Sequence, residues 1–411
     1  MKILDFHIEI YIEENIEESS NFKSEVNCLN LINKVIPKIQ EQSNDDSFVV
    51  SQFRKQQFNM LPEYLDNCMS YLNKLSNGYV KRKSISRKSI LKYQDIYGYR
   101  ISSYDIEVEN PDDRSICKPF AIFNLPDLIH DNFFYINGSY YTPCIYILDK
   151  PLIYKKNSIK LYGLINSITL FFKLGDDRAI FLGKNIPLAY FLQWFIDDTD
   201  KIKKLYEKFK LSYVEYDFDT LLNYFTDFFT CASDPDVINQ LFYDLFFDNL
   251  TEKIYQEIYH KKFTFKELIN YVIDDYLQEN FVHFVDLTEK RLMFLEVLLA
   301  PLFKKVRDLA YQLARGNQFS SIAINPNEII AYFMSDLKHQ FFYDNVNFYS
   351  GISVHKASFM NPNTTIAPSE ISAVHPSHFG RICPITISAQ KPGEIISIVP
   401  SAKINKYGLF A

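Results

Sequence analysis

Alternating and β-branched runs predict strands in the first half of the chain. Residues 97–108, 133–136 and 144–148 concentrate aromatic and β-branched side chains between turn-forming residues, which is typical of strands. Asn137-Gly138 separates two of these runs and predicts a tight hairpin turn. Strand character continues over residues 160–185, with a turn expected at Gly175-Asp176.

Helical spacing of apolar positions predicts helices before and after these strands. Residues 26–39 carry apolar side chains three and four positions apart. Pro187 precedes an amphipathic run over residues 188–195, and proline suits the first turn of a helix. Residues 200–285 continue with helical patterns whose apolar faces are rich in Phe and Tyr.

The last third combines predicted helices with a loop-rich tail. Asp286 followed by Glu289 resembles a capping box and predicts a long helix over residues 292–313. A further helix is expected over residues 326–342, and the chain from Asn345 onward is rich in Ser, Pro, Asn and His. Mixed helices and antiparallel strands together predict the α+β class.

Composition indicates a globular chain of two or three domains. The chain has 411 residues, of which 47% are hydrophobic and 23% charged. The net charge of −6 means that contact with nucleic acid would need local basic patches or basic partner chains. Six scattered cysteines without a Cys-x-x-Cys pair argue against a zinc ribbon or a disulfide framework. Neither a signal peptide nor a membrane-spanning run is expected.

Signatures of self-contained catalysis are missing from the sequence. There is no Gly-x-x-x-x-Gly-Lys phosphate loop and no nucleophile elbow. Adjacent aspartates occur, but two-metal chemistry needs carboxylates that converge on ions about 4 Å apart, so we expect solvated turns or helix ends. These pairs are Asp45-Asp46, Asp112-Asp113, Asp176-Asp177, Asp197-Asp198 and Asp274-Asp275.

A histidine pair in the tail allows two interpretations. His375 and His378 lie close to Cys383, which suggests a zinc site, but His355 is the only other candidate ligand nearby. The sequence therefore favours a hydrogen-bonded structural role, and no metal ligand is assigned.

One run in the tail carries a specific family resemblance. Residues 374–385 read Val-His-Pro-Ser-His-Phe-Gly-Arg-Ile-Cys-Pro-Ile. This run resembles the fork region of the β subunits of multisubunit DNA-directed RNA polymerases, whose pattern is Val-His-Pro-Ser/Thr-His-Tyr-Gly-Arg-x-Cys-Pro-Ile. His355-Lys356 resembles the His-Lys before the family's fork loop. Asn405-Lys406-Tyr407-Gly408 resembles the Asn-Glu-Tyr-Gly that follows the fork.

Three weaker matches follow the family's order along the chain. Residues 131–138 resemble an early β hairpin, residues 184–192 a helix start in the lobe, and residues 286–310 the long helix that returns to the protrusion. Ala411 follows soon after the fork motif, whereas an intact bacterial β subunit continues much further. The resemblance thus implies the N-terminal part of a split β subunit, as in polymerases of large bacteriophages.

The resemblance also implies an architecture of protrusion, lobe and fork. Residues 1–150 would form the first part of the protrusion and residues 151–290 the lobe. Residues 291–344 would return to the protrusion, and residues 345–411 would form the fork region.

As a subunit of this kind, the chain would support RNA synthesis without holding the catalytic centre. It would form one wall of the DNA cleft and place the fork beside the active centre, and it would be inactive alone. The Mg²⁺ of the assembled enzyme would be held by a β′-like partner, with no cofactor or catalytic residue in this chain. Further partners would be a C-terminal β-like chain, a promoter-specificity subunit, DNA and RNA, in the cytoplasm of an infected bacterium or in the virion.

The resemblance nominates residues near nucleic acid and residues that hold the fork. Those near nucleic acid or the active centre are His355, Lys356, Asn361, Pro362, Asn363, Arg381 and Lys391. Those with a structural role in the fork are His375, Pro376, His378, Gly380, Cys383 and Pro384. Arg381 has a rival role as a buried partner of a carboxylate. Met360-Asn361-Pro362-Asn363 replaces the family's Gly-Pro-Gly-Gly, so the fork loop is expected to be remodelled.

A basic cluster offers a separate candidate path for DNA. Its members are Lys81, Arg82, Lys83, Arg87 and Lys88. Phosphate contacts by such side chains fix the register of nucleic acid. A run of this kind is also typical of a solvated surface, and the sequence leaves both interpretations open.

A second function, from another class, is a polymerase-derived interaction protein. Such a protein would bind host transcription machinery or DNA as a decoy, without joining an active enzyme. Partner genes that encode the β′-type Asn-Ala-Asp-Phe-Asp-Gly-Asp motif would favour the polymerase subunit.

Overall fold

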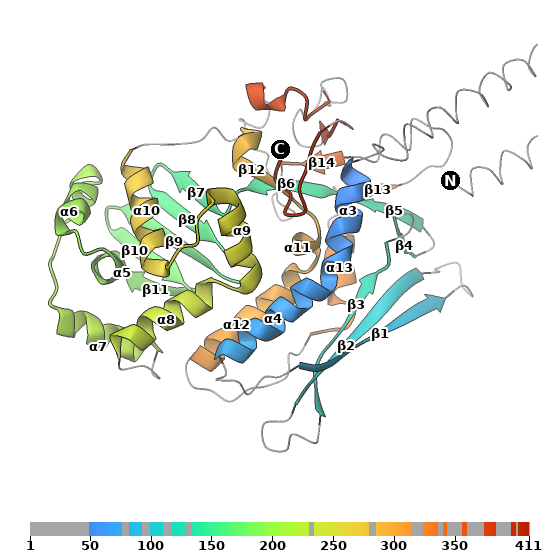
Figure 1. The fold of residues 1–411 in the computed structure, drawn as a ribbon, viewed down its shortest axis with the longest axis horizontal. Helices are drawn as coiled ribbons and strands as arrows, with labels where there is room; N and C mark the ends of the chain where they lie inside the picture. The colour runs from blue at the N-terminus through green and yellow to red at the C-terminus, as the bar shows by residue number, and fades with distance from the viewer. Residues whose placement is uncertain are drawn as a thin grey trace, which may run out of the picture. The chain divides into compact units, whose positions relative to one another are not determined.

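The computed structural model describes most of the chain from residue 49 onward, and two hydrophobic cores organise it (Figure 1). The described ranges are residues 49–75, 82–92, 99–109, 117–128, 133–137, 139–229, 234–278, 285–314, 324–335, 340–342, 356–359, 374–383, 396–399 and 402–410. The first core draws on residues from both ends of this set, whereas the second lies within residues 159–276. The helix expected over residues 26–39 lies outside the described residues.

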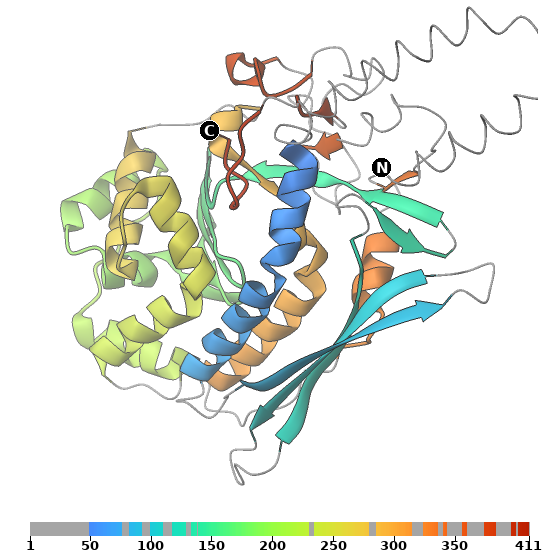
Figure 2. The same cartoon turned by 45° about the vertical axis from the view of Figure 1, so that its right-hand side comes forward.

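Helices that are far apart in the sequence build the first core. They are α3 (Val49–Asn59), α4 (Leu61–Leu75), α11 (Leu295–Leu298), α12 (Ala300–Ala314) and α13 (Glu328–Ser335). α4 packs along α12, and both views show them side by side (Figures 1 and 2). Apolar side chains of α4 recur at three- and four-residue spacing, as in Leu61, Tyr64, Leu65 and Cys68, so one face is buried.

A three-stranded antiparallel sheet packs beside these helices. Its strands are β1 (Arg82–Lys92), β2 (Tyr99–Glu109) and β3 (Cys117–Pro126), in the order β1-β2-β3. Tyr104 of β2 lies opposite Phe123 of β3, and their rings stack with centroids 5.4 Å apart. The side chain of Asn124 donates to Asn327 Oδ1 at 2.8 Å, which joins β3 to the start of α13.

Two further sheets extend the first core. One has the order β13-β5-β4, with β4 (Phe134–Ile136), β5 (Ser139–Pro143) and β13 (Gln340–Phe342). The other has the order β12-β6-β14-β15, with β6 (Ile145–Asp149), β12 (Lys290–Met293), β14 (Lys356–Ser358) and β15 (Ile396–Ser397). In this second sheet β14 runs parallel to β6, and the other pairs are antiparallel.

The second core belongs to a module that leaves the first core after β6 and returns at β12. Five strands form an antiparallel meander in chain order: β7 (Leu152–Lys155), β8 (Ser158–Tyr162), β9 (Ser167–Lys173), β10 (Asp176–Phe181) and β11 (Lys184–Pro187). Along β9 the buried positions alternate, with Ile168, Leu170 and Phe172 on one face. Gly175, with φ +77°, lies in the turn before β10.

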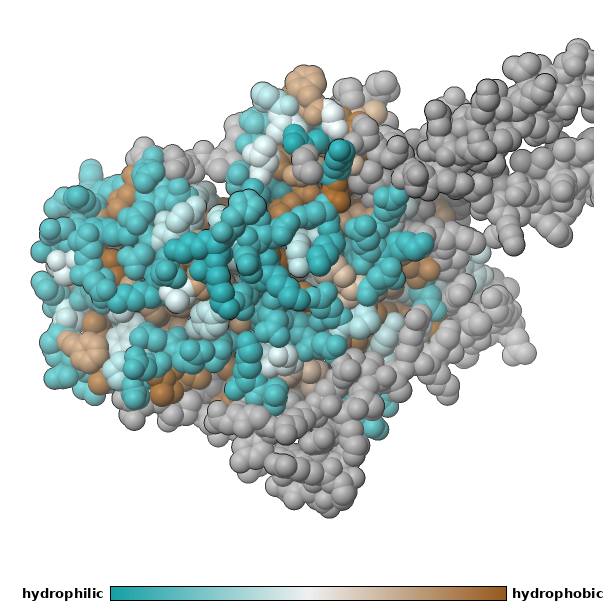
Figure 3. Space-filling model, viewed as in Figure 1, coloured by the Kyte–Doolittle hydropathy of each residue, from teal (hydrophilic) through white to brown (hydrophobic). Residues whose placement is uncertain are grey.

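Helices cover one face of this meander (Figure 2). They are α5 (Leu188–Phe195), α6 (Thr199–Lys208), α7 (Phe218–Phe229), α8 (Pro235–Phe246), α9 (Asn249–Tyr259) and α10 (Phe265–Leu277). The ring of Phe242 in α8 has six phenylalanine rings around it at centroid separations of 4.9 to 6.1 Å. Hydrophilic residues cover most of the outer surface of α8 to α10 in Figure 3, as expected for amphipathic helices.

The α+β class with antiparallel sheets is confirmed, and so are several local predictions. α5 spans Leu188–Phe195 with Pro187 as its N-cap. Asn137, with φ 51°, occupies the hairpin between β4 and β5. The polymerase architecture of protrusion, lobe and fork stays a prediction.

The long helix expected over residues 292–313 is wrong. Leu292 lies in strand β12, and the helical part is divided into α11 and α12. Pro301 stands at the start of α12, where its missing N–H prevents continuation of α11. Asp286 caps only the short 3-10 helix Leu287–Glu289, by accepting from Thr288 N at 2.9 Å.

The helix expected over residues 326–342 is also too long. α13 ends at Ser335, and Gln340–Phe342 forms β13. Phe341 pairs with Thr142 of β5, so pairing with a distant strand overrides the local helical spacing.

No helix in the described part of the chain is both long and apolar enough to cross a membrane.

Candidate nucleic-acid interface

The His-Pro-Ser-His run folds into a short 3-10 helix, Pro376–His378. His375 caps it, because Nδ1 of His375 accepts from the N–H of Ser377 at 3.3 Å. Nδ1 of His378 returns the contact by accepting from the N–H of His375 at 3.5 Å. Pro376 occupies the first helical position, where no N–H is needed. The residues of this run therefore stabilise the short helix through local contacts.

The same turn is anchored to the point where the inserted module returns to the first core. Nε2 of His378 lies 2.8 Å from the carbonyl oxygen of Val285. Since Nδ1 of that ring accepts a hydrogen bond, Nε2 is the nitrogen that donates. The hydroxyl of Ser377 accepts from the N–H of Leu287 at 2.9 Å. The turn thus holds residues 285–287 with two side chains.

Asp286 adds a charged contact beneath the turn. Its Oδ1 lies 3.6 Å from Nδ1 of His375, a contact that is ionic only when the histidine is protonated. Partial burial opposes ionisation of Asp286, but hydrogen bonds from Thr288 and the nearby His375 hold its pKa below the ordinary value. The carboxylate is therefore charged at neutral pH.

Arg381 closes the turn from the other side. Its Nη1 donates to the carbonyl of Ser377 at 3.0 Å, and its backbone N–H donates to the carbonyl of His378 at 3.1 Å. Gly380 precedes it with φ +72°, a left-handed conformation that favours glycine. The residue is half-buried, and its guanidinium braces the turn.

The strands around the turn bring distant parts of the tail together. Lys356 in β14 pairs with Ser397 in β15, and the N–H of Cys383 donates to the carbonyl of Ser397 at 2.8 Å. The N–H of Val399 donates to the carbonyl of Arg381 at 3.0 Å. Residues 396–399 therefore lie between the backbones of Lys356 and Arg381, two of the nominated basic residues.

The Asn-Lys-Tyr-Gly run forms a second pinned turn. Oδ1 of Asn405 accepts from the N–H groups of Tyr407 and Leu409, each at 3.0 Å. Gly408 has φ +82°, and its carbonyl accepts from the N–H of Leu292 at 2.7 Å. Gln57 of α3 donates to the carbonyl of Lys406 at 2.7 Å. This turn fastens the end of the chain to β12 and α3.

Two large apolar side chains stand out from the turn of residues 374–383. Val374 is 74% exposed and Phe379 is 79% exposed, although both belong to a turn with a well-bonded backbone. The red-orange segment above β12 in Figure 1 carries them. An exposed ring on a rigid support is suited to stacking on a base or packing against another chain.

The structure describes only part of the nominated site. His355, Asn361, Pro362, Asn363, Lys391, Pro384 and Lys81 lie outside the described residues. The backbone of Lys356 is placed in β14, and the backbones of Arg82, Lys83, Arg87 and Lys88 are placed in β1. The roles given to these residues stay predictions. Within the described residues, no group of three His, Cys, Asp or Glu side chains is placed to hold a metal ion.

Sequence reasoning missed three participants of the turn. Ser377 bonds to Leu287, and Asp286 contacts His375, so both connect the turn to residues 285–287. Phe379 supplies the exposed ring. No signal in the sequence marked Phe379 as exposed, since phenylalanine is more often buried. Asp286 lies 89 residues before His375, and no local pattern connects them.

Comparison with known proteins yields a distant relationship to RNA polymerase β subunits. A stretch of 100 residues is 36% identical to the DNA-directed RNA polymerase subunit beta of Orientia tsutsugamushi (strain Boryong). The match covers 21% of this chain and only 7% of the relative's length. No family model matches the chain.

Proposed function

We propose that this chain is the N-terminal part of a split β subunit of a multisubunit, DNA-dependent RNA polymerase of the large-bacteriophage type. In this proposal the chain forms one wall of the DNA cleft, and its fork turn lies beside the active centre. A β′-like partner holds the catalytic Mg²⁺, and a C-terminal β-like chain completes the subunit. The enzyme acts in the cytoplasm of the infected bacterium, or enters with the virion.

One observation carries the proposal: the fork-like run forms a well-bonded turn that exposes Phe379 and is braced by Arg381. The hydrogen bonds of His375, Ser377 and His378 fix its backbone to residues 285–287. A wedge that keeps two strands apart must resist displacement, and a turn bonded on both sides meets this need. The distant relationship to a β subunit supports the same role.

The test is affinity purification of the tagged chain from cells in which its own genome is expressed. We expect co-purification of a chain with the Asn-Ala-Asp-Phe-Asp-Gly-Asp motif and of a C-terminal β-like chain. The complex should make RNA on a DNA template only when Mg²⁺ is present, and the isolated chain should make none. A chain recovered only with the host polymerase, without added RNA synthesis, would instead establish the decoy function.

A further inference from the structure

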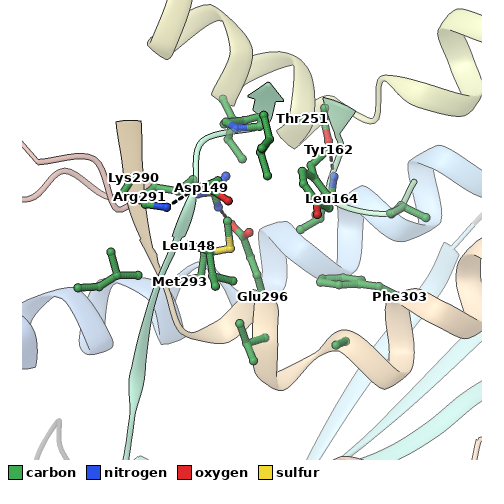
Figure 4. Close-up of a pocket in the computed structure, with 18 of the residues that line it drawn as sticks. Leu148, Asp149, Tyr162, Leu164, Thr251, Lys290, Arg291, Met293, Glu296 and Phe303 are labelled. Carbon is green, nitrogen blue, oxygen red and sulfur yellow. Dashed lines mark hydrogen bonds and ion pairs between the residues drawn. The ribbon is translucent and has the colours of Figure 1, made fainter. Parts of the chain in front are cut away.

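A cavity of about 610 Å³ lies where the two cores meet, between the inserted module and α12 (Figure 4). β6, β7, β8, α9, β12, α11 and α12 all contribute to its wall. Pockets for small organic molecules have volumes of roughly 300–1,000 Å³. The apolar part of the wall includes Ile147, Ile153, Leu164 and Phe303, which would suit a hydrocarbon or aromatic body.

Both carboxylates of the cavity wall form ion pairs with buried cations. Lys290 is 3% exposed and its Nζ contacts Oδ1 of Asp149. Arg291 is 4% exposed and its Nη2 contacts Oε1 of Glu296, which also accepts from the hydroxyl of Tyr64 at 2.9 Å. Figure 4 shows both pairs on the same side of the cavity. Asp149 and Glu296 are therefore already neutralised by buried cations.

Two more cations line the cavity without a matching carboxylate in its wall. Lys304 and Arg307 are three residues apart on α12, so they lie on one face of the helix. Nε of Arg307 is 4.0 Å from Oδ1 of Asp308. The Asp308 side chain is 57% exposed and lies outside the wall, so this contact is weak. Nε of Arg291 is also buried, and it has no hydrogen-bond partner among the described residues.

The charge balance of the wall therefore favours an anion. Its lining includes four cationic side chains and two carboxylates, so two cations remain without a carboxylate in the wall. Two like charges on one helix face repel each other, and an anion between them would remove that cost.

We propose that this cavity binds a small organic anion. Lys304 and Arg307 hold the acidic group at the α12 side, and the apolar body packs against Ile153, Leu164 and Phe303. The ligand class is an aromatic or aliphatic body that carries one phosphate, sulfonate or carboxylate. This site is separate from the fork turn and does not depend on the polymerase proposal.

The test uses two fluorescent probes of similar body and different charge on the full chain. The anionic probe is 1-anilinonaphthalene-8-sulfonate, and the uncharged one is N-phenyl-1-naphthylamine. We expect saturable binding of the sulfonate at one site. Lys304→Glu and Arg307→Glu should each weaken it about tenfold, the loss of one charged contact. Lys305→Glu, the same charge change on a neighbouring residue outside the wall, should leave it unchanged.

A variant that fills the cavity provides an independent check. Ala300 lines the wall at the start of α12, so Ala300→Phe should reduce binding of both probes. The uncharged probe should bind more weakly than the sulfonate and should not respond to the two charge reversals. Equal affinity for both probes, or sulfonate binding that is unchanged in Lys304→Glu and Arg307→Glu, would overturn the proposal. These two variants change surface-reaching side chains, so they decide the question even if Ala300→Phe fails to fold.

Discussion

The side-chain amide of Asn67 donates to Oδ1 of Asp248 at 2.8 Å, and this buried bond joins α4 to the start of α9. The same carboxylate caps α9 by accepting from the N–H of Thr251 at 2.8 Å and from its hydroxyl at 2.6 Å. Oδ1 of Asn67 accepts from the N–H of Leu250 at 3.1 Å. One buried carboxylate therefore orders a helix terminus and fastens the inserted module to the first core.

Asn67→Ala should destabilise the protein strongly. The substitution leaves a buried carboxylate with one hydrogen bond fewer, and bonds to charged groups contribute about 1.5–3 kcal/mol. We expect urea unfolding to report a loss of about 2–3 kcal/mol. Lys74→Ala, which removes an exposed hydrogen bond to Asn249 on the same helix, should change stability by less than about 0.5 kcal/mol. Equal effects of the two variants would contradict this account.

Asp248 should make stability depend on pH in an unusual direction. Burial raises its pKa above the ordinary 3.8, although hydrogen bonds from Thr251, Asn67 and Leu250 act against this. The folded state then binds the proton more tightly than the unfolded state, so stability is lost as the pH rises from 3.8 through the folded pKa. Relative to Asp248→Asn, the natural protein should become less stable as the pH rises from 3.8 through the folded pKa of Asp248. Urea unfolding of both proteins across this range checks the sign, and a rising difference would refute it.

Gly408→Ala should disrupt the turn that fastens the tail. A Cβ at this position would overlap the carbonyl oxygen of Leu292, and φ is +82°. Backbone strain and overpacking together should cost about 3 kcal/mol or more in thermal or urea unfolding. Gly175→Ala is the matched control, because φ is +77° there but a Cβ would meet nothing within 4 Å. That control should cost about 1–2 kcal/mol, the conformational part alone.

Phe379→Ala should impair RNA synthesis on duplex DNA if the fork turn separates strands. The ring is exposed and therefore contributes little to folding, but stacking on a base is worth about 1–3 kcal/mol. We expect about tenfold less RNA from a duplex template and near-normal RNA from a template with a premelted bubble. Phe379→Tyr should retain activity, and Val374→Ala serves as the control for loss of exposed apolar surface. Equal losses on both templates would exclude a role in strand separation.

Local chemistry determined what the sequence could predict. Pro187 and the apolar spacing after it located α5 to the residue, and Asn137 located a hairpin, because each depends on neighbours in the chain. The late start of the helix expected over residues 292–313 depends on Leu292, which lies in β12 and is hydrogen-bonded to Gly408 more than a hundred residues later. Local spacing contains no information about such a partner.

The candidate site shows the same limit. The motif identified His375, His378 and Arg381 as candidate residues of one local structure. The contacts that hold this structure in place are made to Val285 and Leu287, far away in the sequence. The cavity was not predicted at all, because its cations come from α12 and β12 while its apolar wall comes from both the inserted module and the first core. Only folding brings these together.

The pairing of Asp149 with Lys290 has a consequence for how this chain can change over evolutionary time. The N–H of Lys150 donates to the carbonyl of Glu289 at 3.0 Å, so the chain departs from and rejoins the sheet on adjacent hydrogen-bonded residues. An insertion whose two ends are adjacent in the sheet can become longer or shorter, or be replaced, without altering the strand order β12-β6-β14-β15. Its size is then constrained where it touches α4, α12 and the turn of residues 376–378, and a chain with a very different excursion here can keep the same frame.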